Sequence, residues 1–167
     1  SNYLIIKNST NHENLLKVIS SLIPGIYVNI NIFLKERIFV DIEHLVFNQG
    51  PQRVGPFSHA VKAGGFLFVT GQMPTLTNDP TKLIDGGISN QTHQVMKNLK
   101  TVLIASNSSL EYVVFARVYL VNFKDFDEMN TIYESYFTPD KLPARTCIGV
   151  TGLAVGASIE IDLIAKY

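Results

Sequence analysis

The 167-residue sequence lacks the features that mark several protein classes. Its one cysteine, Cys147, excludes an internal disulfide and is typical of a reducing compartment. The 14 Lys and Arg residues balance 14 Asp and Glu residues, and no run of Lys and Arg is longer than a pair. The basic stripe of a nucleic-acid-binding protein is therefore missing, and we expect no nucleic-acid partner. The four histidines do not have the spacing of metal ligands, so we expect no metal.

Long hydrophobic runs are also scarce. The most apolar window covers residues 15–33, but Lys17 and Pro24 interrupt it, so we expect no membrane-spanning segment. The window could be the remnant of a targeting leader, although Glu13 and the lack of arginine before Arg37 are unlike transit peptides. We therefore predict a cytoplasmic protein, or a protein of an organelle matrix if a leader has been removed.

The sequence does contain ample apolar material for one core. Apolar residues make up 46% of the chain and the mean hydropathy is +0.17, which suits a single domain of this length. Residues 1–36 are rich in Asn, Ile and Leu and differ in composition from the remainder of the chain. We treat 1–36 as an N-terminal extension of uncertain structure and 37–167 as the folded domain.

The domain shows a regular succession of strand and helix patterns. Strands are predicted at residues 38–47, 60–63, 66–70, 113–121, 145–150 and 158–165. A helix is predicted at 88–106, where Ile88, Val95, Leu99, Val102 and Leu103 form an apolar stripe at helical spacing. A second helix is predicted at 125–137, with Asp125 as its cap. A polar loop is expected between 74 and 87.

The order β-β-β-α-β-α-β-β predicts an α+β fold with two helices on one face of a mixed sheet. Along the strand at 113–121 we expect alternate residues to face the core, namely Val114, Ala116, Val118 and Leu120. The opposite face should carry polar or charged residues, namely Arg117, Tyr119, Arg145, Glu160 and Asp162. Because such a face is rarely left wholly to water, we expect an oligomer to form across it or near its edge.

Arg145 is the most informative residue, because it lies just inside an otherwise apolar strand. Strand alternation places Arg145, Cys147 and Gly149 on one face. A largely buried guanidinium needs an anionic partner, and its planar fork suits a carboxylate. Either Arg145 pairs with an Asp or Glu of the protein, or it binds a carboxylate brought by a ligand.

Other residues could accompany Arg145 in a site. Glu160 and Asp162 share one face of the last strand, where they could be exposed, form an ion pair with Arg145 or Arg117, or polarise water. Asn130 falls within the apolar stripe of the second helix, so its amide must bond either a neighbouring loop or a ligand. Cys147 could pack or react, and the Thr70-Gly71 pair offers a hydroxyl and accessible backbone at a strand end. His59 could reach the mouth of a site or be an ordinary loop residue.

These pieces together resemble the RidA (YjgF-type) reactive-intermediate deaminase family, also labelled the L-PSP endoribonuclease family. The resemblance covers about residues 45–167 and rests on segments that run in family order. They are Gly55-Pro56-Phe57-Ser58-His59-Ala60-Val61, Phe68-Val69-Thr70-Gly71-Gln72, residues 91–99, Val118-Tyr119-Leu120, Met129-Asn130-Thr131-Ile132-Tyr133, Pro143-Ala144-Arg145-Thr146-Cys147 and Ile159-Glu160-Ile161-Asp162.

The resemblance implies a chorismate-mutase-like subunit in a homotrimer with a central barrel, and with three sites in clefts between subunits. It also implies hydrolysis of enamines and imines released by pyridoxal-phosphate-dependent dehydratases. The products would be a 2-oxo acid and ammonia, and the reaction would need neither metal nor cofactor.

The resemblance further implies a role for each candidate residue. Arg145 would hold the carboxylate of a small 2-imino or 2-oxo acid, and Glu160 would position water and move its proton. Substrate contacts would come from Thr70, Gly71, Asn130, Phe57 and Cys147.

One position departs from the family pattern. Phe57 stands where the deaminases have tyrosine, so the aromatic wall remains and a hydroxyl is lost. Two alternatives to the deaminase stay open: a non-catalytic module that binds small carboxylates in the same clefts, and a ribonuclease or translation inhibitor. The neutral net charge and the lack of paired histidines argue against the last of these.

Overall fold

The computed structural model describes residues 41–48 and 50–167. The extension predicted at 1–36 and the first part of the strand predicted at 38–47 lie outside the described residues. The elements are β1 (Glu43–Leu45), β2 (Ala60–Ala63), β3 (Phe66–Gln72), β4 (Thr75–Leu76), β5 (Asp79–Leu83), α3 (Ile88–Ala105), β6 (Val113–Leu120), α4 (Phe126–Glu134), β7 (Ala144–Gly149) and β8 (Ile159–Lys166). Short 3-10 turns lie at Leu110–Tyr112, Phe123–Asp125, Pro139–Lys141 and Ala154–Gly156.

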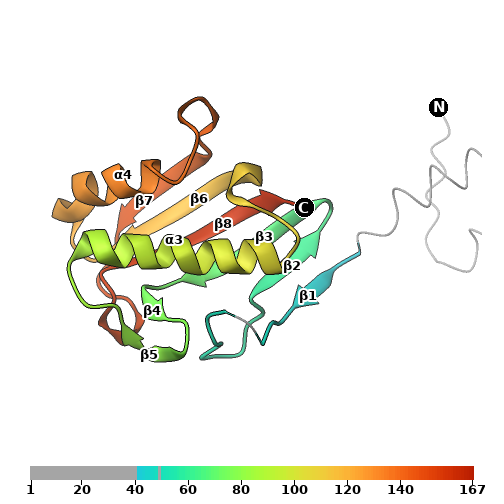
Figure 1. Ribbon diagram of the computed structural model, residues 1–167, viewed down its shortest axis with the longest axis horizontal. Helices are drawn as coiled ribbons and strands as arrows, with labels where there is room; N and C mark the ends of the chain where they lie inside the picture. The colour runs from blue at the N-terminus through green and yellow to red at the C-terminus, as the bar shows by residue number, and fades with distance from the viewer. Residues whose placement is uncertain (1–40, 49) are drawn as a thin grey trace, which may run out of the picture. The chain divides into compact units, whose positions relative to one another are not determined.

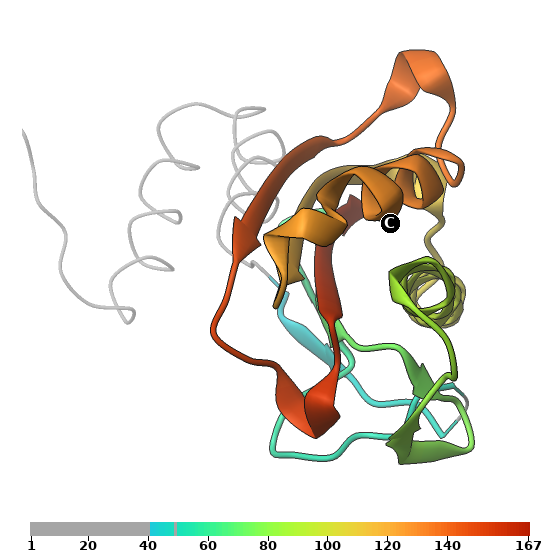
Figure 2. The same cartoon turned by 90° about the vertical axis from the view of Figure 1, so that its left-hand side faces the viewer.

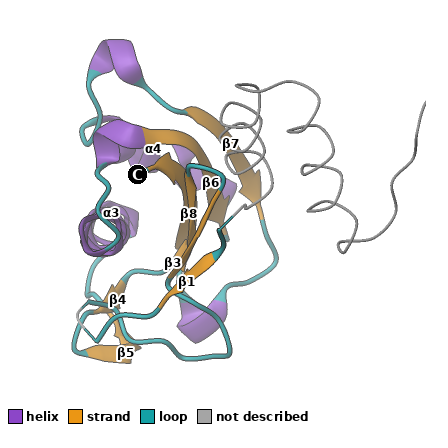
Figure 3. Ribbon diagram, turned by 90° about the vertical axis from the view of Figure 1, so that its right-hand side faces the viewer, coloured by secondary structure: helices purple, strands orange, loops and turns teal. Residues whose placement is uncertain are grey.

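The main sheet has six strands in the order β1-β2-β3-β8-β6-β7 (Figure 1). β6 and β7 are parallel and the other neighbours are antiparallel, so the sheet is mixed as predicted. Both helices lie on the same side of it (Figures 2 and 3). The predicted α+β architecture is confirmed.

The core fills the space between this sheet and the helices. Alternate residues of the strands supply one half, such as Leu67 and Val69 of β3 and Ile161 and Leu163 of β8. The stripe predicted along α3 supplies the other half, because its apolar residues are all buried: Ile88, Val95, Leu99, Val102 and Leu103. The alternation of apolar residues along the strands and the apolar stripe along α3 therefore determine how the sheet and the helix layer pack, and these two layers carry the candidate site residues.

Two local predictions were wrong. The segment at 74–87 is not only loop, because β4 and β5 pair there and Asn98 of α3 donates hydrogen bonds to Met73 O and Thr75 O at 2.9 and 3.0 Å. Val114 was predicted to face the core but is 40% exposed. The register between β6 and β8 shifts between Val113 and Phe115, so Val113 is buried in its place. Asp125 is the N-cap residue of α4, as predicted, although its side chain makes no capping hydrogen bond.

Candidate functional site

Arg145 lies on the helix side of the sheet, which corrects the face that we predicted for it. It is paired in register with Ala116 of β6, a fully buried core residue, so both side chains point toward α4. β7 is the edge strand of the sheet, and its half-buried arginine therefore sits at the rim of the core. Strand alternation alone had not determined which face was the buried one.

Residues of α4 hold the Arg145 guanidinium. Its Nη2 donates a hydrogen bond to Asn130 Oδ1 at 2.7 Å. Its Cζ lies 4.7 Å from the ring centroid of Tyr133 and 5.7 Å from that of Phe126. The aromatic faces and the amide orient the cation without neutralising its charge.

Among the described residues, no carboxylate lies within 4.0 Å of the Arg145 guanidinium. Asp162, one of the partners considered from the sequence, is bound by Arg117 instead. The intramolecular ion pair is therefore not formed within this part of the chain. A bidentate donor that is held in place and lacks an anion is suited to bind a carboxylate ligand.

Cys147 and Tyr133 complete the surroundings of Arg145. Burial raises the pKa of the Cys147 thiol, and the smaller opposing effect of Arg145 does not reverse the shift. The thiol therefore stays protonated at neutral pH, which favours packing over nucleophilic attack. Burial also raises the pKa of Tyr133 to about 12, and its hydroxyl is buried without a hydrogen-bond partner among the described residues.

Thr70, Gly71, Gln72 and Glu160 form a second cluster, separate from the first cluster around Arg145. It lies where β3 departs from regular pairing with β8. The register shifts between Val69 and Gln72, and Thr70 and Gly71 occupy the irregular stretch. Gln72 holds its shape by donating to Thr70 O at 3.0 Å and to Gly71 O at 3.3 Å. Thr70 Oγ1 donates to Ser58 O at 2.6 Å, so this hydroxyl remains available to a ligand only as an acceptor.

Glu160 lies against this irregular stretch. An added Cβ on Gly71 would collide with the Glu160 carboxyl group, so the glycine makes room for it. Burial raises the pKa of Glu160, and the negative charge of Asp162 raises it further. A half-buried carboxyl group whose pKa lies closer to neutrality is suited to accept and return a proton.

A neighbouring network contains one of the ion pairs that the sequence left open, between Arg117 and Asp162, and adds a tyrosine hydroxyl to it. Arg117 Nε donates to both carboxylate oxygens of Asp162, at 2.8 and 3.0 Å, and Tyr119 Oη donates to Asp162 Oδ2 at 2.9 Å. Register pairs Tyr119 with Glu160 and Arg117 with Asp162, so the network adjoins Glu160 on the same face. Arg117 and Asp162 were both expected on this face of the sheet, but only the register between β6 and β8 identifies them as partners.

Phe57 lies at the edge of the second cluster. It is 38% exposed and lines a pocket of about 510 Å³ together with Thr70. His59, by contrast, is 3% exposed and holds the preceding loop. Its Nδ1 accepts from the Phe47 N–H at 3.0 Å, and its Nε2 lies 2.8 Å from Pro51 O. His59 is a structural residue, as one of the two sequence interpretations held.

The two clusters lie on opposite faces of the sheet. The helix side carries Arg145, Cys147 and Asn130. Glu160 and Tyr119 lie on the opposite side, called here the open face because neither α3 nor α4 covers it. One copy of the chain therefore does not bring Arg145 and Glu160 together.

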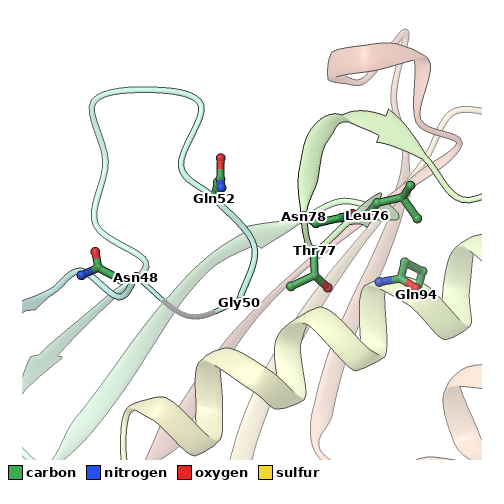
Figure 4. A pocket seen from close by; sticks show the side chains of 7 residues that line it. All are labelled: Asn48, Gly50, Gln52, Leu76, Thr77, Asn78 and Gln94. Atoms are coloured by element: carbon green, nitrogen blue, oxygen red, sulfur yellow. The ribbon is translucent and has the colours of Figure 1, made fainter.

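Other parts of the described surface offer less chemistry. A pocket of about 420 Å³ lies away from both clusters and is lined only by uncharged residues (Figure 4). They are Asn48, Gly50, Gln52, Leu76, Thr77, Asn78 and Gln94. In the part of the chain that the structure describes, no helix is long and apolar enough to cross a membrane.

The model of one protein family, described as Endoribonuclease L-PSP, matches residues 47–167. The chain belongs to this family, which includes the Rid proteins. A RutC family protein of Pyrococcus horikoshii is 40% identical over 127 residues, which are 74% of this chain and 98% of the relative. The mitochondrial protein MMF1 of Saccharomyces cerevisiae is 40% identical over 116 residues, 69% of this chain and 77% of that protein.

A solved structure gives the same answer for the fold. RidA from the Antarctic bacterium Psychrobacter superposes with a TM-score of 0.69 at 29% identity, covering 75% of this chain and 99% of that one. The L-PSP family resemblance stated from the sequence is thus confirmed. The start of the family match at residue 47 also agrees with the sequence-based estimate of about 45.

Proposed function

We propose that the chain hydrolyses small 2-imino acids and their enamine tautomers to 2-oxo acids and ammonia. The observation that carries the proposal is the Arg145 guanidinium, which Asn130 and Tyr133 hold in place and which has no carboxylate within 4.0 Å among the described residues. Membership of the L-PSP family supports a role of this kind.

In the proposed reaction, Arg145 binds the substrate carboxylate through two parallel hydrogen bonds. Glu160 accepts a proton from a water molecule as the water oxygen bonds to the imine carbon. Glu160 returns that proton to the nitrogen, which gives a tetrahedral carbinolamine. Glu160 then moves the hydroxyl proton of this intermediate to the nitrogen as the C–N bond breaks, so the C=O bond forms and ammonia leaves. Every step uses the chain's own residues and water, so the mechanism requires no metal and no cofactor.

The site is completed by a second copy of the chain, because the two clusters face opposite sides of one sheet. We propose that copies form a homotrimer in which Arg145, Asn130 and Cys147 of one copy meet Phe57, Thr70, Gly71 and Glu160 of the next. The open face fits such an assembly, since it carries exposed Phe66 and Phe68 beside the charged network. For localisation, the yeast relative MMF1 is named as mitochondrial, which supports an organelle as one of the two predicted compartments.

The first test measures loss of 2-iminobutanoate, generated by an amino-acid oxidase and trapped competitively with semicarbazide. Wild type should accelerate the loss, Arg145→Ala should not, and Glu160→Gln should lower kcat more than it raises KM. Lys100→Gln, an exposed change on α3, is the matched control. A folded wild type that binds 2-oxobutanoate but does not accelerate hydrolysis would instead identify a carboxylate-binding module.

The second test addresses the shared site. Arg145→Ala and Glu160→Gln should each retain little activity alone, yet a co-refolded equal mixture should regain about one quarter of wild-type activity, because that share of sites receives both intact residues. A mixture as inactive as its components would show that the two residues do not meet between copies.

A further inference from the structure

The pocket beside the second cluster contains a cationic residue that the proposed reaction does not use. The pocket, of about 510 Å³, is within the usual size range of small-molecule sites. Its lining residues are His44, Arg53, Pro56, Phe57, Ser58, Val61 and Thr70. Thr70 lines the pocket and is followed by Gly71, against which Glu160 lies, so the pocket borders the half of the site that would hold the water.

Arg53 is held in this pocket by an uncharged partner. Its Nη1 donates to Phe57 O at 2.9 Å, which fixes the side chain to the loop that carries the aromatic wall. A guanidinium has five N–H donors, so one bond to a carbonyl leaves most of them available. The same bond brings the cation beside the residue at which this chain departs from the deaminase pattern.

The pocket has no negative charge to balance Arg53. None of its lining residues is acidic. No carboxylate among residues 41–48 and 50–167 lies within 4.0 Å of the Arg53 guanidinium. His44 adds a ring that can donate a second hydrogen bond. The arrangement favours an anionic group, and a carboxylate matches the planar fork of arginine.

We propose that Arg53 binds a second carboxylate, carried on the side chain of the substrate, so that the enzyme prefers dicarboxylic 2-imino acids to monocarboxylic ones. This inference rests on the proposed function and adds the substrate class. Arg145 binds the carboxylate next to the imine carbon, Glu160 serves the water, and the substrate side chain extends along Phe57 toward Arg53.

The test compares two imines, the five-carbon dicarboxylic 2-iminoglutarate and the monocarboxylic 2-iminobutanoate, with wild type, Arg53→Gln, Arg53→Lys and Lys100→Gln. We expect wild type to favour the dicarboxylic imine. Arg53→Gln should lower kcat/KM for that imine by about tenfold and change the value for 2-iminobutanoate by less than about twofold. Arg53→Lys should keep part of the preference, and Lys100→Gln all of it.

A loss by Arg53→Gln that is equal for both imines would overturn the inference, because Arg53 would then contact the part that they share. Unchanged values for both would overturn it as well. Calorimetry with 2-oxoglutarate and 2-oxobutanoate separates this inference from the proposed function. Weaker binding of 2-oxoglutarate alone by Arg53→Gln would support the subsite even if no imine is hydrolysed, and equal binding of both acids by wild type would refute it.

Discussion

Replacing Gly71 by alanine should disable Glu160 without unfolding the protein. An ideal Cβ at this position would lie 2.9 Å from Glu160 Cδ and 3.2 Å from its Cγ, and closer still to the carboxyl oxygen Oε1. Gly71 is not among the described glycines with positive φ, so alanine fits the backbone. The side chain of Glu160 must therefore move away from the irregular stretch of β3.

The size of the effect can be worked out from this displacement. The carboxyl oxygen must shift by more than about 1 Å to restore an ordinary contact, and a misplacement of that size can cost about 100-fold in rate. The melting temperature should change little, because the colliding group is the mobile end of a half-buried side chain. Gly152→Ala is the control, since a Cβ there would meet nothing within 4 Å.

The assay is imine hydrolysis by Gly71→Ala, Glu160→Gln and the double variant. If glycine acts only through Glu160, the double variant should be no slower than Glu160→Gln alone, because two changes that remove the same function are not additive. Full activity of Gly71→Ala would refute the reasoning. Losses that multiply in the double variant would show that Gly71 acts on the substrate by another route.

The same geometry supports three further predictions. Asn130→Ala removes the hydrogen bond to the Arg145 guanidinium and should raise KM for 2-iminobutanoate about tenfold, as measured by steady-state kinetics; an unchanged KM would contradict the positioning role. Phe57→Tyr should raise kcat/KM for small imines if the missing hydroxyl matters, and equal values would show that the aromatic wall suffices. Burial raises the pKa of Glu160 in the folded state. The contribution of Glu160 to the free energy of unfolding is therefore complete at low pH, and it declines as the pH rises through this raised pKa. Glu160→Gln should therefore gain melting temperature relative to wild type as the pH rises above the ordinary pKa of glutamate, and a constant difference would contradict the shift.

The parts of the fold that could be predicted are those with a regular apolar period. α3 matches its predicted span to within one residue, because apolar residues recur at helical spacing between Ile88 and Leu103. β4 and β5 were missed because they are short, contain Asp79 and Pro80, and depend on hydrogen bonds from Asn98, which lies far along the chain. Long-range anchors of this kind leave no local periodicity.

The candidate site shows a different limit. Alternation correctly grouped Arg145 with Cys147 and Glu160 with Asp162, but it could not say that the two groups occupy opposite faces. That fact depends on the pairing of Arg145 with Ala116 and of Glu160 with Tyr119, which only the assembled sheet provides. The partner of Asp162 was open for the same reason, and it is Arg117 rather than Arg145.

The separation of the two clusters explains how this chain can keep a reactive pair of opposite charges apart. If Arg145 and Glu160 met within one copy, they would form an ion pair, and each would lose the property that the proposed chemistry needs: a free fork and a raised pKa. Asn130 and Tyr133 instead orient Arg145 without an anion, and burial together with Asp162 raises the pKa of Glu160. In the proposed trimer the substrate carboxylate takes the place that the Glu160 carboxylate would otherwise occupy at Arg145, so assembly and substrate binding together determine which groups are paired.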